Sequence, residues 1–374
     1  MIKKLLFALL LLISFNGFSQ NISLSNQAKV SILTCGTGPK SYSMYGHTGI
    51  RIQDISQQID VVYNYGAFDF STPNFIGRFI KGDLQYFVTN ESYIDFYYNY
   101  QAENREIIEQ ELVLSSAQIN QLFQQLNASV YSEERFYTYK FIDRNCTTMV
   151  VDKINSTLRN EYIQLTTSNK SYREILYPYM SDFYMKLGIQ LIFGTKVDEP
   201  ATRLFLPYEF KKAISQTKVN GKSIEKSNET ILVTRKTEIP FNWLNSVYSL
   251  ISALLVLVIL GKKWIKITYF IIAGLLGIFF SLVGLYSLHE EILWNYNILL
   301  FNPLLLVFTW YYWKNNHAKI IFFGKICLVF LLAYLVYMLN KIHIEIVWPF
   351  IALHLYWIGK LILQYKKSKQ SQGV

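Results

Sequence analysis

The chain has 374 residues, of which 51% are hydrophobic and 17% are charged, and it carries a formal net charge of +10. Much of that positive charge lies beside long apolar stretches, where it orients membrane spans, so it does not indicate nucleic-acid binding. Three cysteines in the whole chain exclude a disulfide framework.

Residues 1–19 have the pattern of a secretory signal. Two lysines precede an apolar run over 5–15, which is too short to span a bilayer, and small residues precede a plausible cut before Gln20. An uncleaved anchor is the alternative. In either case the next domain, expected over 20–240, is exported, and it is long enough for one substantial core.

The pattern of the exported part predicts an α+β domain. We expect strands over 28–34, 47–52, 60–65, 84–89, 105–114 and 137–141. After a serine cap, apolar residues from Ile119 to Leu126 recur at helical spacing and predict an amphipathic helix. A second helix is expected directly after Cys146 and further helix over 172–193, whereas the polar stretch 216–230 is expected to be a loop or a loose hairpin.

Before residue 240 the chain has one histidine, His47, and two cysteines, Cys35 and Cys146. A thiol becomes a nucleophile when a base or a cation stabilises its thiolate, and the start of a helix favours the thiolate further. Cys146 at a helix start and His47 on a strand are therefore the parts of a papain-type site, in the order of its circularly permuted relatives. A Cys35–Cys146 disulfide is the alternative.

Asn64 is the candidate to orient the imidazole. If the strands around it form a hairpin that turns at Gln57, Asn64 lies diagonal to His47 on the same face of the sheet. A register error of one residue would turn it away. Tyr63 and Asp60 are substitutes, and Asn64 could instead serve only the turn chemistry of its own segment.

Five further residues are candidates to contact a substrate, and each also has a purely structural interpretation. Arg51 would bind an anion or be a solvated strand arginine, and Tyr45 would donate to an oxyanion or be a core aromatic. Asn145 and Thr147 flank the thiol. His289 precedes two glutamates in an outward loop; we predict no metal site there and place His289 beside the exported domain at the membrane surface.

From Trp243 onward the composition changes abruptly. Five apolar stretches, each close to the roughly 20 residues that cross a bilayer core, lie near 244–260, 265–288, 296–313, 320–339 and 345–364. Lysines follow the first and third stretches and close the chain. Because positive loops stay in the cytoplasm, we expect a multi-pass protein of the inner membrane, with five helices over 241–365, a cytoplasmic tail over 366–374 and the exported domain in the periplasm.

Three motifs in this order resemble the Lnb-type lipoprotein N-acyltransferases. They are Ser43-Met44-Tyr45-Gly46-His47-Thr48-Gly49-Ile50-Arg51, Val62-Tyr63-Asn64-Tyr65-Gly66-Ala67-Phe68-Asp69 and Asn145-Cys146-Thr147-Thr148. The likeness spans roughly residues 28–215 and extends more loosely to the membrane segment around His289. It implies a permuted papain-like acyltransferase in which Cys146 accepts a fatty acyl chain from a phospholipid and His47 is the general base and acid. The acceptor would be the N-terminal amine of a lipoprotein.

Acyl transfer from a phospholipid, without a cofactor, is therefore the function that we expect. A membrane-tethered cysteine amidase or peptidase acting on cell-wall peptides would need the same two residues but no phospholipid. An assembly or sensory protein with structural Cys and His residues would retain its function in Cys146→Ala.

Overall fold

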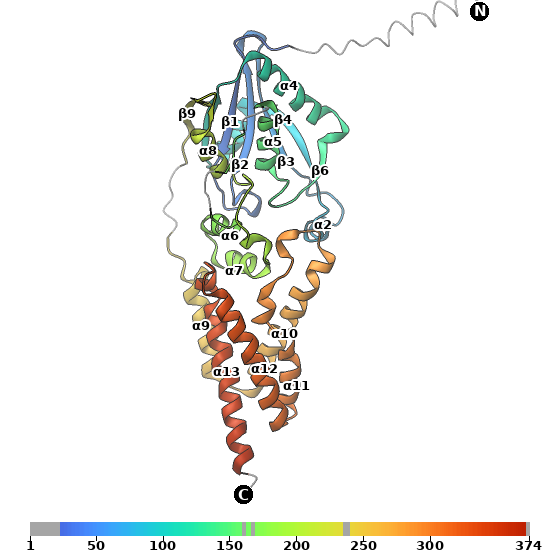
Figure 1. Cartoon of the computed structure of the whole chain (residues 1–374), viewed down its shortest axis with the longest axis vertical. Helices are drawn as coiled ribbons and strands as arrows, with labels where there is room; N and C mark the ends of the chain where they lie inside the picture. Colours follow the sequence, from blue (N-terminus) through green and yellow to red (C-terminus); the bar gives the residue numbers. More distant parts are fainter. Residues whose placement is uncertain (1–22, 159–161, 166–168, 235–239, 372–374) are drawn as a thin grey trace, which may run out of the picture.

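The structure, a computed structural model, describes residues 23–158, 162–165, 169–234 and 240–371. A sheet domain forms one end of the molecule and a group of apolar helices the other (Figure 1). The predicted signal over 1–19 lies outside the described residues, as does the end of the predicted cytoplasmic tail.

The sheet domain is built on seven antiparallel strands. Their order in the sheet is β6-β4-β3-β2-β1-β5-β9, and their bounds are β1 Lys29–Cys35, β2 His47–Asp54, β3 Ile59–Ala67, β4 Gln85–Ser92, β5 Ile107–Leu112, β6 Phe136–Thr138 and β9 Glu225–Leu232. The hairpin of β2 and β3 turns at 55–57, and Gly49 lies opposite Asn64. This is the predicted register, and it places Asn64 diagonal to His47.

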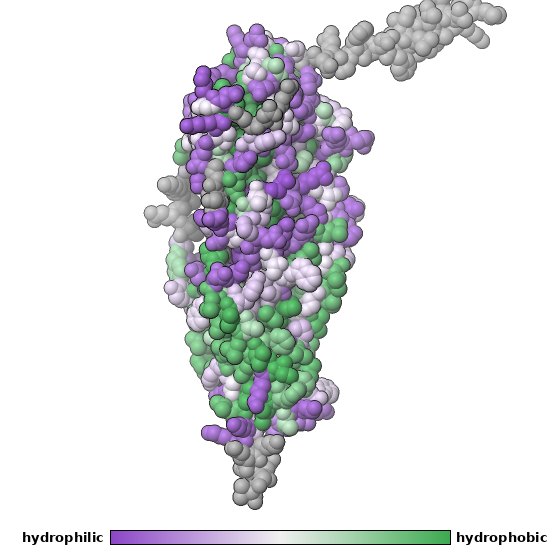
Figure 2. Space-filling model, in the orientation of Figure 1, coloured by the Kyte–Doolittle hydropathy of each residue, from purple (hydrophilic) through white to green (hydrophobic). Residues whose placement is uncertain are grey.

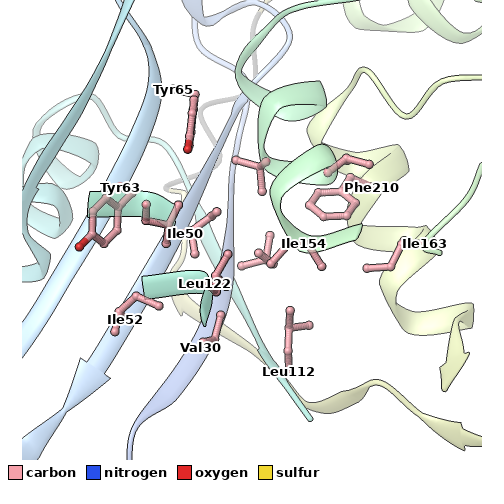
Figure 3. Close-up of a cluster of buried hydrophobic side chains, with 14 of the residues drawn as sticks. Val30, Ile50, Ile52, Tyr63, Tyr65, Leu112, Leu122, Ile154, Ile163 and Phe210 are labelled. Atoms are coloured by element: carbon pink, nitrogen blue, oxygen red, sulfur yellow. The ribbon is translucent and has the colours of Figure 1, made fainter. Parts of the chain in front are cut away.

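Alternation along the strands gives the sheet two apolar faces. On one face, Val30 and Ile50 pack with residues of α4 (Ser116–Tyr131), α5 (Cys146–Leu158) and α8 (Pro207–Gln216) in the main core (Figure 3). On the other face, Leu33, Cys35 and Val62 pack against Phe96 of α3 (Tyr93–Ala102). The central strands are therefore buried on both sides, as their nearly continuous apolar sequence requires.

Two predictions for this domain were only partly correct. The expected helix over 172–193 is broken into α6 (Tyr172–Leu176) and α7 (Phe183–Ile192), because Pro178 interrupts the first helix and Asp182 caps the second. The polar stretch 216–230 contains a small hairpin of β7 (Lys218–Val219) and β8 (Lys222–Ser223). The chain then continues into β9. This segment forms a strand because it pairs with the edge of β5 that β1 leaves free.

The helical part consists of α9 Val247–Leu260, α10 Lys263–Tyr286, α11 Leu304–Trp313, α12 His317–Met338 and α13 Ile344–Ser371. Among the described residues, four segments are long and apolar enough to cross a membrane, namely Lys263–Tyr286, Glu290–Trp313, His317–Met338 and Ile344–Ser368. The remaining predicted span, 244–260, corresponds to α9, which is apolar but has only 14 residues. The ammonium group of Lys263 binds the carbonyl of Trp313 and the side chain of Asn315. Basic loops thus gather at the end farthest from the sheet, as the charge pattern predicts.

A short helix, α2 (Phe75–Lys81), and the loop that follows α10 join the two parts. The backbone N–H of Leu288 donates to the carbonyl of Lys81 at 2.7 Å, and Oγ of Ser287 donates to the carbonyl of Ile80 at 2.7 Å. Further along the loop, Tyr296 donates to Asp198, which also pairs with the buried guanidinium of Arg173. The end of the sheet where β3 leads into α2 therefore faces the membrane helices (Figure 1).

Candidate functional site

Cys146 is the first residue of α5, as the sequence predicts. Asn145 caps the helix: its Oδ1 accepts from the N–H groups of Thr147 and Thr148 at 2.9 and 3.0 Å, and its Nδ2 donates to the carbonyls of Phe141 and Phe205. Asn145 is buried, so its side chain fixes the start of the helix and does not face solvent. Of the first three N–H groups in the helix, only that of Cys146 is left unused by this cap.

Thr147 lies beneath the thiol and ties it to the sheet. Its hydroxyl, which is fully buried, shares a 3.0 Å hydrogen bond with the hydroxyl of Thr48 on β2 and lies 3.9 Å from Sγ of Cys146. The two threonines therefore hold the start of α5 against the start of β2, where His47 is the first residue.

His47, Asn64 and Glu91 form a line of side chains across three neighbouring strands. Nε2 of His47 lies 3.0 Å from Oδ1 of Asn64, and Nδ2 of Asn64 donates to Glu91 at 2.6 Å. The other oxygen of Glu91 accepts from Asn99 of α3 at 3.1 Å. Because Asn64 occupies Nε2, the remaining nitrogen of the ring is available to the thiol, with which His47 forms a side-chain hydrogen bond.

Cys146 and His47 each shift the pKa of the other. Burial alone would raise the pKa of the Cys146 thiol, but the charge and hydrogen bond of His47, the N–H of Thr48 and the hydroxyl of Thr147 lower it overall. Burial alone would lower the pKa of His47, but Cys146 and the hydrogen bond of Asn64 raise it overall. The two pKa values therefore move toward each other, which reduces the free-energy cost of moving a proton from sulfur to imidazole.

Gly66 leaves room for this pair. It lies at a bulge near the end of β3 with a φ of +114°, and a Cβ there would lie 3.3 Å from Cβ of Cys146 and 3.8 Å from Cε1 of His47. Any larger residue would adopt a strained backbone and crowd the reacting groups. Both Cys146 and His47 are partly exposed, so small molecules have access to them.

Cys35 is not a partner of Cys146, so the disulfide alternative is wrong. Both thiols are free, and Cys35 is fully buried opposite His47 on the neighbouring strand. Burial raises the pKa of the Cys35 thiol to about 12, with only partial compensation from its hydrogen bond to Tyr100. A thiol of this kind is a packing residue and not a nucleophile.

Arg51 has a structural role instead of the substrate contact that we considered. Its guanidinium pairs with both oxygens of Asp60 at 2.7 Å, binds Glu109 at 2.9 Å and stacks over the ring of Tyr93 at 3.4 Å. With its donors engaged and its side chain 11% exposed, it has no free face for a substrate anion. The sequence could not show this, because Glu109 comes from a strand that is distant in sequence.

Replacing Arg51 with methionine is expected to destabilise the sheet domain, because it leaves the largely buried carboxylate of Glu109 without a partner. The cost of about 3 kcal/mol would lower the melting temperature of this domain by about 6–12 °C. Thermal unfolding of the detergent-solubilised chain measures this shift. Arg203→Met is the matched control, since its ion pair with Asp152 is exposed; an equal shift in both variants would contradict the assignment.

The other two candidates, Tyr45 and His289, form no hydrogen bond to the thiol–imidazole pair among the described residues. The hydroxyl of Tyr45 is buried, has no hydrogen-bond partner within the described residues, and its ring packs against Phe141 and Tyr179. His289 binds the carbonyl of Phe79 at 2.8 Å and so fastens α2 to the loop after α10. Within the described ranges, no three His, Cys, Asp or Glu side chains are grouped so that they could hold a metal ion.

Glu91 is the site residue that the sequence analysis missed. Nothing in the sequence determines the register between β3 and β4. In the structure this register places Thr89 opposite Asn64, so that Glu91 lies within hydrogen-bonding distance of the Asn64 side chain. Burial raises the pKa of Glu91 above its ordinary value, while Asn64 and Asn99 oppose this shift through hydrogen bonds. Because Glu91 accepts from Nδ2 of Asn64, it fixes the amide with Oδ1 toward the imidazole.

Asn64→Ala is expected to lower the reactivity of Cys146 toward iodoacetamide at neutral pH, because the imidazole loses the group that orients it. Glu91→Gln is expected to have a smaller effect in the same direction, since a glutamine can still accept from Asn64 but can also donate. Alkylation rates of the full chain measure both. Gln85→Ala, on the exposed end of β4, is the control; unchanged rates in all three variants would contradict the role given to Asn64.

The fold and the site together define a membrane-associated α+β protein with a thiol–imidazole pair at the end of its sheet domain that meets the apolar helices. Residues 15–178 match the family model described as the Lnb N-terminal periplasmic domain. This match covers less than half of the chain but includes His47, Asn64 and Cys146. It shows that this part of the chain is similar to the Lnb N-terminal domain, and it points to an enzyme of lipoprotein modification with a periplasmic sheet domain. The comparisons with curated proteins and with solved structures gave no significant match.

Proposed function

We propose that this protein is a cysteine-dependent acyltransferase of the inner membrane that moves a fatty acyl chain from a phospholipid to the N-terminal amine of a lipoprotein. The observation that carries the proposal is the line Cys146–His47–Asn64, set where the periplasmic domain meets the membrane helices. The order of His47 and Cys146 along the chain is that of permuted papain-like enzymes.

In the first half-reaction, Cys146 gives its proton to His47 and its sulfur attacks an ester carbonyl of the phospholipid. The negative charge on the carbonyl oxygen develops near the start of α5, where the N–H of Cys146 and the helix dipole stabilise it. The ester C–O bond then breaks, His47 returns the proton to the leaving alkoxide, and a lysophospholipid departs. The acyl chain remains on Cys146 as a thioester.

In the second half-reaction, the N-terminal amine of a lipoprotein attacks the thioester carbonyl. His47 accepts a proton from the attacking amine, the C–S bond breaks, and an amide is formed. The thiolate then takes the proton back from His47, which restores the starting state. Asn64 keeps the ring in position in both steps by holding Nε2, and Glu91 holds Asn64.

Intact-mass spectrometry of the purified chain in phospholipid nanodiscs tests this function. The wild type should gain the mass of a fatty acyl group, which hydroxylamine removes and which passes to an added lipoprotein with a free N-terminal amine. Cys35→Ala should retain the adduct because that thiol is buried and unreactive. Absence of both the adduct and the acylated lipoprotein would reject the proposal, and cleavage of cell-wall peptides without phospholipid would favour an amidase.

A further inference from the structure

The segment over residues 70–81, which contains α2 and which we call the α2 segment, exposes large apolar side chains. Phe70, Ile76, Phe79 and Ile80 are 67%, 72%, 46% and 48% exposed. Four such residues within one short stretch are unusual on a surface that faces water. They need a covering partner, and the neighbours of the segment indicate which one.

The α2 segment is fastened to the outer end of a membrane helix. Ser287, Leu288 and His289 each bind a backbone carbonyl of α2 at 2.7 to 2.8 Å. With 24 residues, α10 is about 36 Å long, whereas the hydrocarbon core is about 30 Å thick. The last turn of α10, and therefore α2 beside it, lies at the level of the lipid headgroups.

The residues around this junction are typical of a membrane interface. Leu285 and Tyr286 in the last turn of α10 are 84% and 58% exposed. Trp294, in the loop that follows, is 84% exposed and has a φ of +53°, a strained backbone for a large residue. Arg78 on α2 is also exposed and offers a charge that suits lipid phosphates. Figure 2 shows the apolar surface of the helices extending up the right side of the molecule to the height of α2.

A continuous group of aromatic rings connects the α2 segment with the catalytic thiol. Phe68, two residues after Gly66, contacts Phe70 and Phe75 with ring centroids 4.9 and 5.8 Å apart, and contacts Tyr86 at 5.2 Å. Tyr86 in turn stacks on Tyr139 at 4.5 Å. Gly66 itself lies against the thiol, since a Cβ there would be 3.3 Å from Cβ of Cys146, so the group of rings begins beside the site.

We propose that the α2 segment inserts its apolar side chains into the outer leaflet and guides the acyl ester of a phospholipid along Phe70, Phe75 and Phe68 to Cys146. The occupant of this surface is therefore the bilayer that the chain itself spans. The location of the segment in the leaflet does not depend on the reaction that the protein catalyses, whereas its role in guiding the phospholipid rests on the proposed acyl transfer.

A fluorescent probe tests the location. Ile76→Cys and Ile55→Cys, each in the Cys146→Ala background, are labelled with an environment-sensitive dye and reconstituted in vesicles of phosphatidylethanolamine and phosphatidylglycerol. Ile76 and Ile55 are 72% and 75% exposed, and Ile55 lies at the far end of β2, about 25 Å from His47. In the vesicles, the emission of the dye at 76 should be blue-shifted by its apolar surroundings and quenched by spin-labelled phospholipid, whereas the dye at 55 should show neither effect. Equal emission at both positions would overturn the proposal even if acyl transfer is confirmed.

Paired aspartate variants test the guiding role. Ile76→Asp should lower the rate of acyl-adduct formation from vesicle phospholipid by about tenfold or more. This factor corresponds to the free energy lost when one apolar side chain is no longer buried in the leaflet. Ile55→Asp should leave the rate unchanged. Iodoacetamide should alkylate Cys146 equally fast in both, because the thiol is unaltered. Unchanged acylation in Ile76→Asp would reject the guiding role. If the wild type forms no adduct at all, the acyl transfer itself fails and the quenching result still decides the location.

Discussion

Replacing Cys146 with alanine is expected to lower the rate of acyl transfer by about a millionfold, which is the typical loss when an enzyme loses its covalent nucleophile. In the proposed mechanism this side chain forms the bond that holds the acyl group between the two half-reactions. Because the thiol is partly exposed and its removal leaves the Asn145 cap intact, the variant should fold normally. Transfer of labelled acyl chains from phospholipid to a lipoprotein measures the rate.

Cys146→Ser sharpens this test. A hydroxyl fills the same space but remains protonated beside His47, so it should restore little of the activity. Cys327→Ala, which removes a buried thiol of α12 far from the sheet, should keep the wild-type rate. Substantial transfer by Cys146→Ala would mean that the thiol is not the acyl carrier and would favour a structural role for it.

Replacing His47 with alanine is expected to reduce acyl transfer by about a thousandfold or more, because both half-reactions lose their base and acid. The same variant should alter the pH dependence of thiol alkylation. In the wild type the pKa of Cys146 is below its ordinary value, so alkylation should accelerate at a lower pH than for a free cysteine. Without the imidazole this curve should move to higher pH, because only the N–H of Thr48 and the hydroxyl of Thr147 then oppose the effect of burial on the thiol.

The wild-type acyl-transfer rate should follow a bell-shaped pH profile. At low pH the imidazole of His47, whose pKa is raised, is already protonated and cannot accept a proton from the thiol or the amine. At high pH the pair has lost the proton that the leaving alkoxide needs. His317→Ala is the matched control, because this histidine lies beside Tyr365 at the far end of the helices. An alkylation curve that is identical in His47→Ala and the wild type would contradict the pairing.

The core of the site could be predicted from the sequence because local rules determine it. The turn at 55–57 fixes the register of one hairpin, and this alone brings Asn64 to His47. The cap Asn145 and the apolar spacing after Cys146 predict the helix that presents the thiol. Contacts between strands that are distant in the chain follow no local rule. For that reason Glu91 and the carboxylate partner of Arg51 could only be identified in the structure.

The membrane helices likewise combine features that the local sequence predicts with contacts that it does not. Hydropathy and lysine positions are sufficient to find the apolar segments and to place their basic ends together, because the bilayer imposes those features on the sequence itself. The hydrogen bond between His289 and the carbonyl of Phe79 is different. It joins a loop to a helix some two hundred residues away, so the location of His289 could be predicted from the sequence but its partner could not.

The bonds between α2 and the end of α10 have one more consequence, which concerns the thickness of the membrane. Because three contacts tie α2 to the residues that directly follow α10, the height of Cys146 above the hydrocarbon core depends on how deeply α10 sits in it. Lipids with longer chains would draw the helix end, and the thiol with it, closer to the ester bonds, and shorter chains would lift both away. Bilayer composition would then regulate this enzyme through hydrophobic mismatch, without any change in the residues that carry out the chemistry.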